Sequence, residues 1–164
     1  MGGTVRYPRK AQGLIAFAIV AITLALFSTS AGAAATRAEY IAQADPICAS
    51  ELAATKRTFG GVAGDLRNGR FKQAASKFRR TTRVFKKGVA GVAAIPPPAT
   101  DAALLSQWVQ MLRDQIPPAK RVANLLGHNA RPGRINNALA HLFRLSDQTQ
   151  FLVKDYGFTS CNEM

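Results

Sequence analysis

The clearest hydrophobic pattern in this chain lies between residues 71 and 92. Apolar side chains and one threonine recur there at alternating steps of four and three, at Phe71, Ala75, Phe78, Thr82, Phe85, Val89 and Val92. Side chains at this spacing share one face of an α-helix. The pattern therefore predicts an amphipathic helix that follows the turn at Asn68 and Gly69. We expect it to stop at Ile95, because the three prolines that come next cannot continue the hydrogen-bond ladder.

Another helix is predicted to begin at Thr36. Thr36 and Glu39 have the spacing of a capping box, in which each side chain bonds the other residue's free backbone N–H. Apolar residues then share one face at Ile41, Ala44, Cys48, Leu52, Phe59, Val62 and Leu66. Pro46 removes a backbone donor within this pattern, although Asp45 could cap a second start with Pro46 in its first turn. The sequence predicts a kink or a restart at this point.

A third helix is expected between the three prolines and Gly127. Thr100 and Asp101 have the character of an N-cap, and Gly127 fits a left-handed C-cap position. The apolar face consists of Leu105, Trp108, Leu112, Ile116, Val122 and Leu126. Because Pro117 and Pro118 interrupt this face, we expect the helix to be broken or bent there.

A fourth helix is expected from about Pro132 onward. Its apolar face consists of Ile135, Leu139, Leu142, Leu145, Thr149, Leu152 and Tyr156. Gly157 precedes the apolar Phe158, as in a Schellman cap, and is predicted to close the helix. No segment alternates with a period of two for long enough to predict a strand.

Residues 1–35 have the order of a signal peptide. Basic residues precede an uncharged apolar run over residues 14–27, and small residues lead up to Ala35. This order is typical of an export signal, and the small-residue rule allows cleavage after Ala33 or after Ala35. The alternative is an uncleaved membrane anchor, because residues 14–35 are long enough to cross a bilayer of about 30 Å.

Four helices with short connections favour an all-α, up-down-up-down four-helix bundle over residues 36–164. When the chain folds back about residues 69, 97 and 129, Cys161 ends at the height of Cys48. The register therefore predicts that the two cysteines of the chain are neighbours, and an oxidising exported location favours a disulfide between them. The alternative is a pair of free thiols, with Cys48 as a small core residue.

The composition narrows the class of protein further. The chain has 164 residues, the size of one domain, and its apolar fraction of 48% is too high for a disordered polyelectrolyte. It has 22 Lys and Arg against 9 Asp and Glu, a formal net charge of +13, and most of this excess lies beyond residue 35. The two cysteines are 113 positions apart and the two histidines 13 apart, which is not the ligand spacing of a Cys/His zinc site, and two cysteines are too few for a disulfide-dense scaffold.

Two segments, AEYIAQADPIC at 38–48 and YGFTSC at 156–161, resemble a loose group of small exported bacterial proteins, mostly actinobacterial, with no established activity. The likeness spans the chain after residue 35. It rests on an Ala-rich start with a cysteine in the first helix, a proline-marked second loop, and a C-terminal Tyr-Gly followed closely by Cys. It implies export and a disulfide-closed helical bundle, and it implies no mechanism. Pro46 departs from the pattern of the group.

The most unusual feature of the chain is a run of positive charge in the second predicted helix. Nine Lys and Arg residues and no acidic residue lie from Arg67 to Lys87. We predict that seven of them form a surface for anions, centred on Arg79, Arg83 and Lys86; the seven are Lys72, Lys77, Arg79, Arg80, Arg83, Lys86 and Lys87. Export favours anionic lipid or a phosphate-rich wall polymer as the partner over nucleic acid. The alternative is a solvated face that keeps the protein soluble.

Sequence signals for catalysis or metal binding are weak. His128 and His141 lack the spacing of metal ligands, and the carboxylates are scattered without a catalytic pair. The sequence contains no phosphate-binding loop, dinucleotide fingerprint or nucleophile motif. We therefore predict an exported, non-enzymatic protein of the cell envelope or the extracellular space, with no cofactor and no metal.

A second hypothesis is a binding module that carries an apolar small ligand inside the bundle. The residues considered for its lining are Trp108, Met111, Leu112, Phe71, Phe78, Phe85 and Phe143. Aromatic residues at helical spacing more often form a core. A cavity in the structure would favour this hypothesis, and a close-packed core would remove it.

Overall fold

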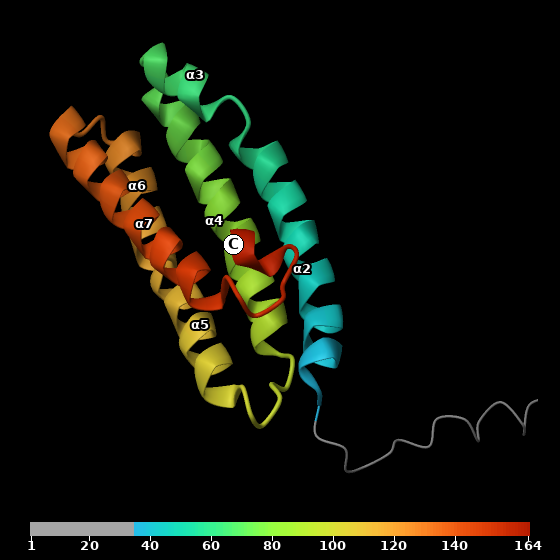
Figure 1. Ribbon diagram of the computed structural model, residues 1–164. Helices are drawn as coiled ribbons and strands as arrows, with labels where there is room; N and C mark the ends of the chain where they lie inside the picture. The colour runs from blue at the N-terminus through green and yellow to red at the C-terminus, as the bar shows by residue number, and fades with distance from the viewer. Residues whose placement is uncertain (1–34) are drawn as a thin grey trace, which may run out of the picture. The chain divides into compact units, whose positions relative to one another are not determined.

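The computed structural model describes residues 35–164, which consist of helices joined by short turns (Figure 1). The helices are α2 (Arg37–Phe59), α3 (Val62–Arg67), α4 (Phe71–Ala93), α5 (Ala102–Asp114), α6 (Ile116–Gly127), α7 (Pro132–Val153) and the 3-10 helix η1 (Cys161–Glu163). No strand occurs within these residues, so the predicted all-α class is confirmed. Apart from Ala35, the predicted signal peptide lies outside the described residues. None of the helices in residues 35–164 is both long and apolar enough to span a bilayer.

The first predicted helix begins as expected and ends differently. The capping box is present: the Glu39 backbone N–H donates to Thr36 Oγ1 at 3.2 Å, and the Thr36 N–H donates to Glu39 Oε2 at 2.7 Å. Of the two outcomes predicted at Pro46, a kink or a restart, the restart is wrong, because α2 continues through that residue. Pro46 lies on the exposed face, where the carbonyl that loses its donor can bond water. The break comes later, at Gly61, whose φ of +75° favours glycine.

Two glycines of α4 allow close approach of α2. A Cβ built on Gly88 would meet the side chain of Glu51, and one built on Gly91 would lie 3.1 Å from Cγ2 of Ile47. Further along, the hydroxyls of Thr58 and Thr81 are 2.9 Å apart. Positions that advance along α2 therefore match positions that go back along α4, so the two helices are antiparallel and lie side by side (Figure 1).

The third predicted helix is broken at the expected place but capped at a different residue. It divides into α5 and α6 around Gln115, with the two prolines in the first turn of α6. The predicted left-handed cap at Gly127 is wrong, because α6 includes Gly127 and Asn129 has the positive φ, +50°. The N–H of Ala130 bonds the carbonyl of Leu125, and that of Asn129 bonds Leu126, the Schellman pattern. Asparagine tolerates this conformation, and Leu126, whose carbonyl accepts one of the two bonds, is fully buried.

The predicted disulfide joins α2 to the segment after α7. Cys48 and Cys161 are bonded, and both are buried. The Asp45 carboxylate lies one turn earlier and accepts the backbone N–H groups of residues 159–161, at 2.9 to 3.1 Å, and the Thr159 hydroxyl at 2.8 Å. The C-terminal segment is thus fixed to α2 by a covalent bond and by a carboxylate that satisfies its free donors.

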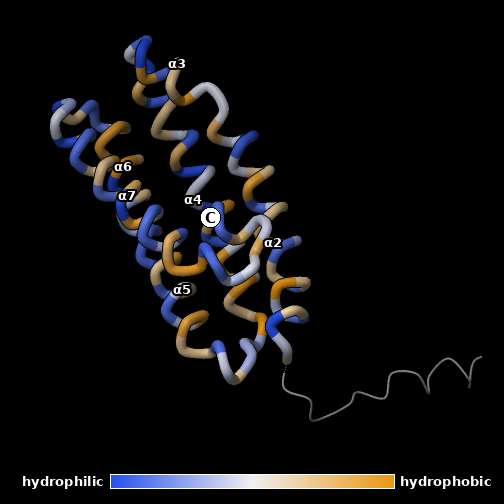
Figure 2. The backbone as a smooth tube through the Cα atoms, viewed as in Figure 1, coloured by the Kyte–Doolittle hydropathy of each residue, from blue (hydrophilic) through white to orange (hydrophobic). Residues whose placement is uncertain are grey.

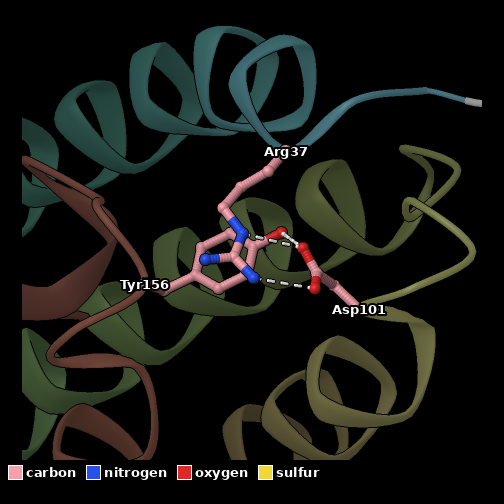
Figure 3. Close-up of polar contacts among 3 residues, drawn as sticks. All are labelled: Arg37, Asp101 and Tyr156. Atoms are coloured by element: carbon pink, nitrogen blue, oxygen red, sulfur yellow. Dashed lines mark hydrogen bonds and ion pairs between the residues drawn. The ribbon is translucent and has the colours of Figure 1, made fainter.

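Asp101 occupies the N-cap position of α5, as predicted, but its side chain makes no capping bond. Its carboxylate accepts two hydrogen bonds from Arg37 and one from the Tyr156 hydroxyl, all at 2.9 Å (Figure 3). The Arg37 guanidinium also lies over the Tyr156 ring, 4.8 Å from its centroid. Hydrogen bonding to Arg37 lowers the pKa of Asp101, and burial together with the bond to Asp101 raises the pKa of Tyr156. Both groups therefore keep their ordinary charge at neutral pH, and the cluster clamps α2, α5 and the C-terminal segment together.

The buried apolar residues form two clusters rather than one. The first surrounds the disulfide and includes Trp108, Tyr156 and Phe158. The second lies toward the α3 end of the bundle and includes Phe78 and Leu126. In Figure 2 the hydrophobic stretches of the helices are interrupted by hydrophilic bands, as expected when each helix buries one face. Between the two clusters, the packing of buried apolar side chains is interrupted.

Candidate functional site

The seven predicted anion-binding residues all lie on α4, and six of them are exposed. Lys77 differs, because its Nζ lies 2.7 Å from the buried carboxylate of Asp65, which also pairs with Arg70 at 2.8 Å. These two partners lower the pKa of Asp65. None of the six exposed residues forms an ion pair within residues 35–164; they are Lys72, Arg79, Arg80, Arg83, Lys86 and Lys87. Their charges are available to an external anion.

A surface hollow of about 300 Å³ lies along the seam where α6 packs on α4. It is lined by Arg79, Thr82, Arg83 and Lys86 of α4 and by Lys120 and Asn124 of α6. The three residues predicted as central contacts are therefore brought together. Arg79 also lies beside Gly127, 3.4 Å from the place of a Cβ there, at the C-terminal end of α6 where the helix dipole favours a cation.

Positive charge continues on the other side of α6. A hollow of about 290 Å³ between α6 and α7 is lined by Arg121, Arg134 and His141, and a neighbouring one of about 700 Å³ adds Lys120 and His128. None of the three hollows is lined by an acidic residue. We call this surface the basic face and define it by Arg79, Arg83, Lys86, Lys120, Arg121 and Arg134.

The sequence prediction missed half of the basic face. Lys120, Arg121 and Arg134 come from two other helices, and they do not belong to a long run of positive charge like the one on α4. The adjacent pair Lys120 and Arg121, on a helix without acidic residues, was a weak signal. Only the packing of α6 between α4 and α7 places these residues with the α4 charges.

An apolar cleft of about 210 Å³ lies between α2, α4 and α7, and it is open to solvent. Its lining takes Phe78, Phe59 and Leu142 from the side of the second core cluster and Phe85 and Met164 from the side of the first. The cleft is therefore the gap between the two clusters. Phe78, Phe85 and Phe143 line it as the ligand hypothesis supposed. The other residues of that hypothesis do not line it: Trp108 and Leu112 are fully buried in the first cluster, Phe71 packs against the second, and Met111 lies outside the cleft lining.

One carboxylate is buried at the edge of this cleft. Glu51 of α2 is only 6% exposed, and the Thr55 hydroxyl donates to its Oε1 at 2.6 Å. Burial raises the pKa of Glu51, and the bond from Thr55 opposes that shift. Sequence analysis did not identify Glu51, because an isolated glutamate in a helix has no signal of burial.

The histidines do not form a site. A ring nitrogen of His128 lies 2.8 Å from the Asn124 carbonyl oxygen, and one of His141 lies 3.1 Å from Arg144. In residues 35–164, no group of three or more His, Cys, Asp or Glu side chains is arranged to hold a metal ion. No protein family, curated protein or solved structure matches this chain.

Proposed function

We propose that this protein associates with anionic surfaces of the cell envelope through its basic face. The ligands are phosphate groups, either of lipid headgroups or of wall polymers. The observation that carries this proposal is that three adjacent hollows, formed by α4, α6 and α7, are lined by cations and by no acidic residue.

The cost of this arrangement supports a role in binding. Like charges one turn apart, such as Arg79 and Arg83, destabilise a helix by about 0.2 to 0.5 kcal/mol per pair. A bound anion would offset this repulsion. Each Lys or Arg close to an anionic membrane contributes about 1 kcal/mol, so Arg79, Arg83 and Lys86 together give about 3 kcal/mol, roughly a hundredfold in affinity.

The test is sedimentation of the full-length chain with vesicles of phosphatidylcholine alone or mixed with phosphatidylglycerol, at low and physiological salt. The binding variant carries Arg79→Gln, Arg83→Gln and Lys86→Gln. The control variant carries Lys56→Gln, Arg57→Gln and Arg113→Gln, three exposed cations outside the basic face, and so has the same net charge. A soluble poly(glycerol phosphate) replaces the vesicles in a second arm.

Salt-sensitive binding that falls about a hundredfold in the first variant and little in the control would support the proposal. The two arms distinguish a membrane ligand from a wall polymer. Equal losses in both variants would show that only net charge matters, and absence of binding in both arms would make the basic face a solubility feature.

Export and the finer topology are parts of the same proposal. Export, with removal of residues 1–33 or 1–35 by a signal peptidase, would place the protein in an oxidising location, and the Cys48–Cys161 bond is consistent with one. The up-down-up-down order of the helices agrees with the antiparallel packing of α2 on α4. The intact mass of the protein recovered from the culture tests export, since a full-length chain with both cysteines reduced would refute it.

The apolar cleft supports a second candidate function, the binding of a small apolar ligand. At about 210 Å³ the cleft is larger than the roughly 150 Å³ cavity that holds a benzene molecule. Eight of its 15 lining residues are aliphatic or aromatic and seven are polar, and apolar walls combined with polar groups are usual in a ligand site. Binding of a neutral aryl alcohol, measured by calorimetry, tests this function.

A further inference from the structure

The apolar cleft has a charge pattern opposite to that of the rest of the protein. Of the 15 residues that line it, two are acidic, Glu51 and Glu163, and none is Lys or Arg. The chain as a whole has 22 Lys and Arg against 9 Asp and Glu. We propose that the cleft binds small hydrophobic amines and that the Glu51 carboxylate pairs with their ammonium group. This inference rests on the second candidate function and is independent of the basic face.

The Glu51 side chain is held in place before any ligand arrives. Its Cβ and Cγ lie against Gly88 of α4, at 3.0 and 2.7 Å from where a Cβ of that residue would be. Cε of Met164 lies against the same glycine, 3.3 Å from that position. Glycine in a helix interior destabilises it by about 0.5 to 1 kcal/mol relative to alanine. At Gly88 the missing methyl group leaves the room that the glutamate stem occupies.

The Glu51 carboxylate is incompletely paired. Within residues 35–164 it accepts one hydrogen bond, from Thr55, and it forms no ion pair. A carboxylate has room for further donors. Oε2 has no hydrogen-bond partner within residues 35–164 and is not one of the fully buried unpaired atoms there, so a ligand cation can reach it. Because folding has already removed most of the Glu51 surface from water, a charge-assisted bond to that cation forms with only a small further loss of solvation.

The polar groups that line the cleft favour a positively charged ligand over a negatively charged one. The hydroxyls of Thr55, Thr81 and Ser146 and the Glu163 carboxylate line the cleft, and no cation lines it to receive an anionic headgroup. A fatty acid or a phosphate ester would place its charge near Glu51 and be repelled. A protonated amine on an aryl or short alkyl body matches both the apolar walls and the acidic edge.

The test compares three ligands with the same body and different ends: 4-phenylbutylamine, 4-phenylbutanol and 4-phenylbutyrate. Titration calorimetry on the full-length chain at pH 7 measures their affinities. We expect the amine to bind about tenfold or more tightly than the alcohol, and the carboxylate to bind more weakly than either. In Glu51→Gln the amine should bind no better than the alcohol, and the affinity for the alcohol should be unchanged.

Two further variants locate the binding. Glu163→Gln alters the exposed carboxylate of the same cleft and should reduce the preference for the amine only slightly. Ser146→Phe introduces a ring into the cleft from the partly exposed face of α7 and should weaken all three ligands. The circular dichroism and urea midpoint of each variant show whether it is folded.

The results separate this inference from the function on which it rests. Equal binding of amine and alcohol, or a preference that survives in Glu51→Gln, overturns the role of Glu51 while leaving the cleft a ligand site. Absence of binding by all three ligands overturns both. Sedimentation that shows a dimer unaffected by the amine would mean that a second copy of the chain covers the cleft, and this also overturns the proposal.

Discussion

Replacement of Gly88 by alanine should destabilise this protein, although the same change in a helix usually stabilises. Gly88 is buried in the interior of α4, where alanine normally gains about 1 kcal/mol through its higher helix propensity. The new Cβ, however, would lie 2.7 Å from Cγ and 3.0 Å from Cβ of Glu51. These atoms are close to the α2 backbone, so they cannot swing away as the end of a long side chain would.

The size of the effect follows from two opposing contributions. An extra methyl group in a packed interior costs about 1 to 3 kcal/mol, and the propensity gain of about 1 kcal/mol opposes it. The net effect is therefore a loss of about 0 to 2 kcal/mol. Because the new methyl group would lie closer than van der Waals distance to two atoms, we expect Gly88→Ala to fall in the upper half of this range and to lose about 1 to 2 kcal/mol of unfolding free energy. Displacement of Glu51 should also weaken the preference of the cleft for an amine.

The assay is urea unfolding at pH 7, followed by circular dichroism, with Gly64→Ala as the matched control. Gly64 also lies in a helix, but a Cβ there has no neighbour within 4 Å, so this variant should gain about 0.5 to 1 kcal/mol. A Gly88→Ala protein as stable as the original, or more stable, would refute the reasoning that this glycine exists to accommodate Glu51.

Three other predictions concern the disulfide, the hydrogen bonds of Asp45 and the capping box of α2. Replacing both Cys48 and Cys161 by serine opens a loop closed across 113 positions, and the chain-entropy argument predicts a loss of about 5 kcal/mol, measurable as a fall in the urea midpoint. Burial alone would raise the pKa of Asp45, but the N–H groups of residues 159–161 and the Thr159 hydroxyl lower it overall; its contribution to stability is therefore present above about pH 5 and lost as the pH falls below the ordinary value of 3.8. Asp45→Asn should lower stability at pH 7 and flatten its dependence on pH between 5 and 3, whereas an unchanged acid transition would contradict this role. Thr36→Ala should cost about 1 kcal/mol by removing the α2 capping box, and a thermal melt with no shift would show that the box contributes nothing.

Local features of the fold were accessible from the sequence because they depend on neighbours in the chain. The capping box at Thr36, the amphipathic face of α4 and the break before Pro117 each follow from a few adjacent residues. The cysteine pair was also predictable, because an antiparallel bundle that folds back about residues 69, 97 and 129 places Cys161 level with Cys48.

At Pro46 and at the side chain of Asp101, tertiary contacts outweighed local preference. Pro46 is a helix breaker, yet α2 continues through it, anchored on both sides by the buried residues Ala44 and Cys48. Asp101 is a good capping residue, yet its carboxylate turns to Arg37 and Tyr156, far away in the sequence, because an ion pair with two further hydrogen bonds is stronger than one cap.

For the basic face and the apolar cleft, too, some features follow from the sequence of one helix and others follow only from the packing of several helices. The charged face of α4 could be predicted from the order of its residues, since a helix fixes which of its own residues share a side. The packing of the helices adds Lys120, Arg121 and Arg134 to that face and buries Glu51 at the edge of an apolar cleft. Burial and proximity between helices are properties of packing, and the pattern within any one helix does not contain them.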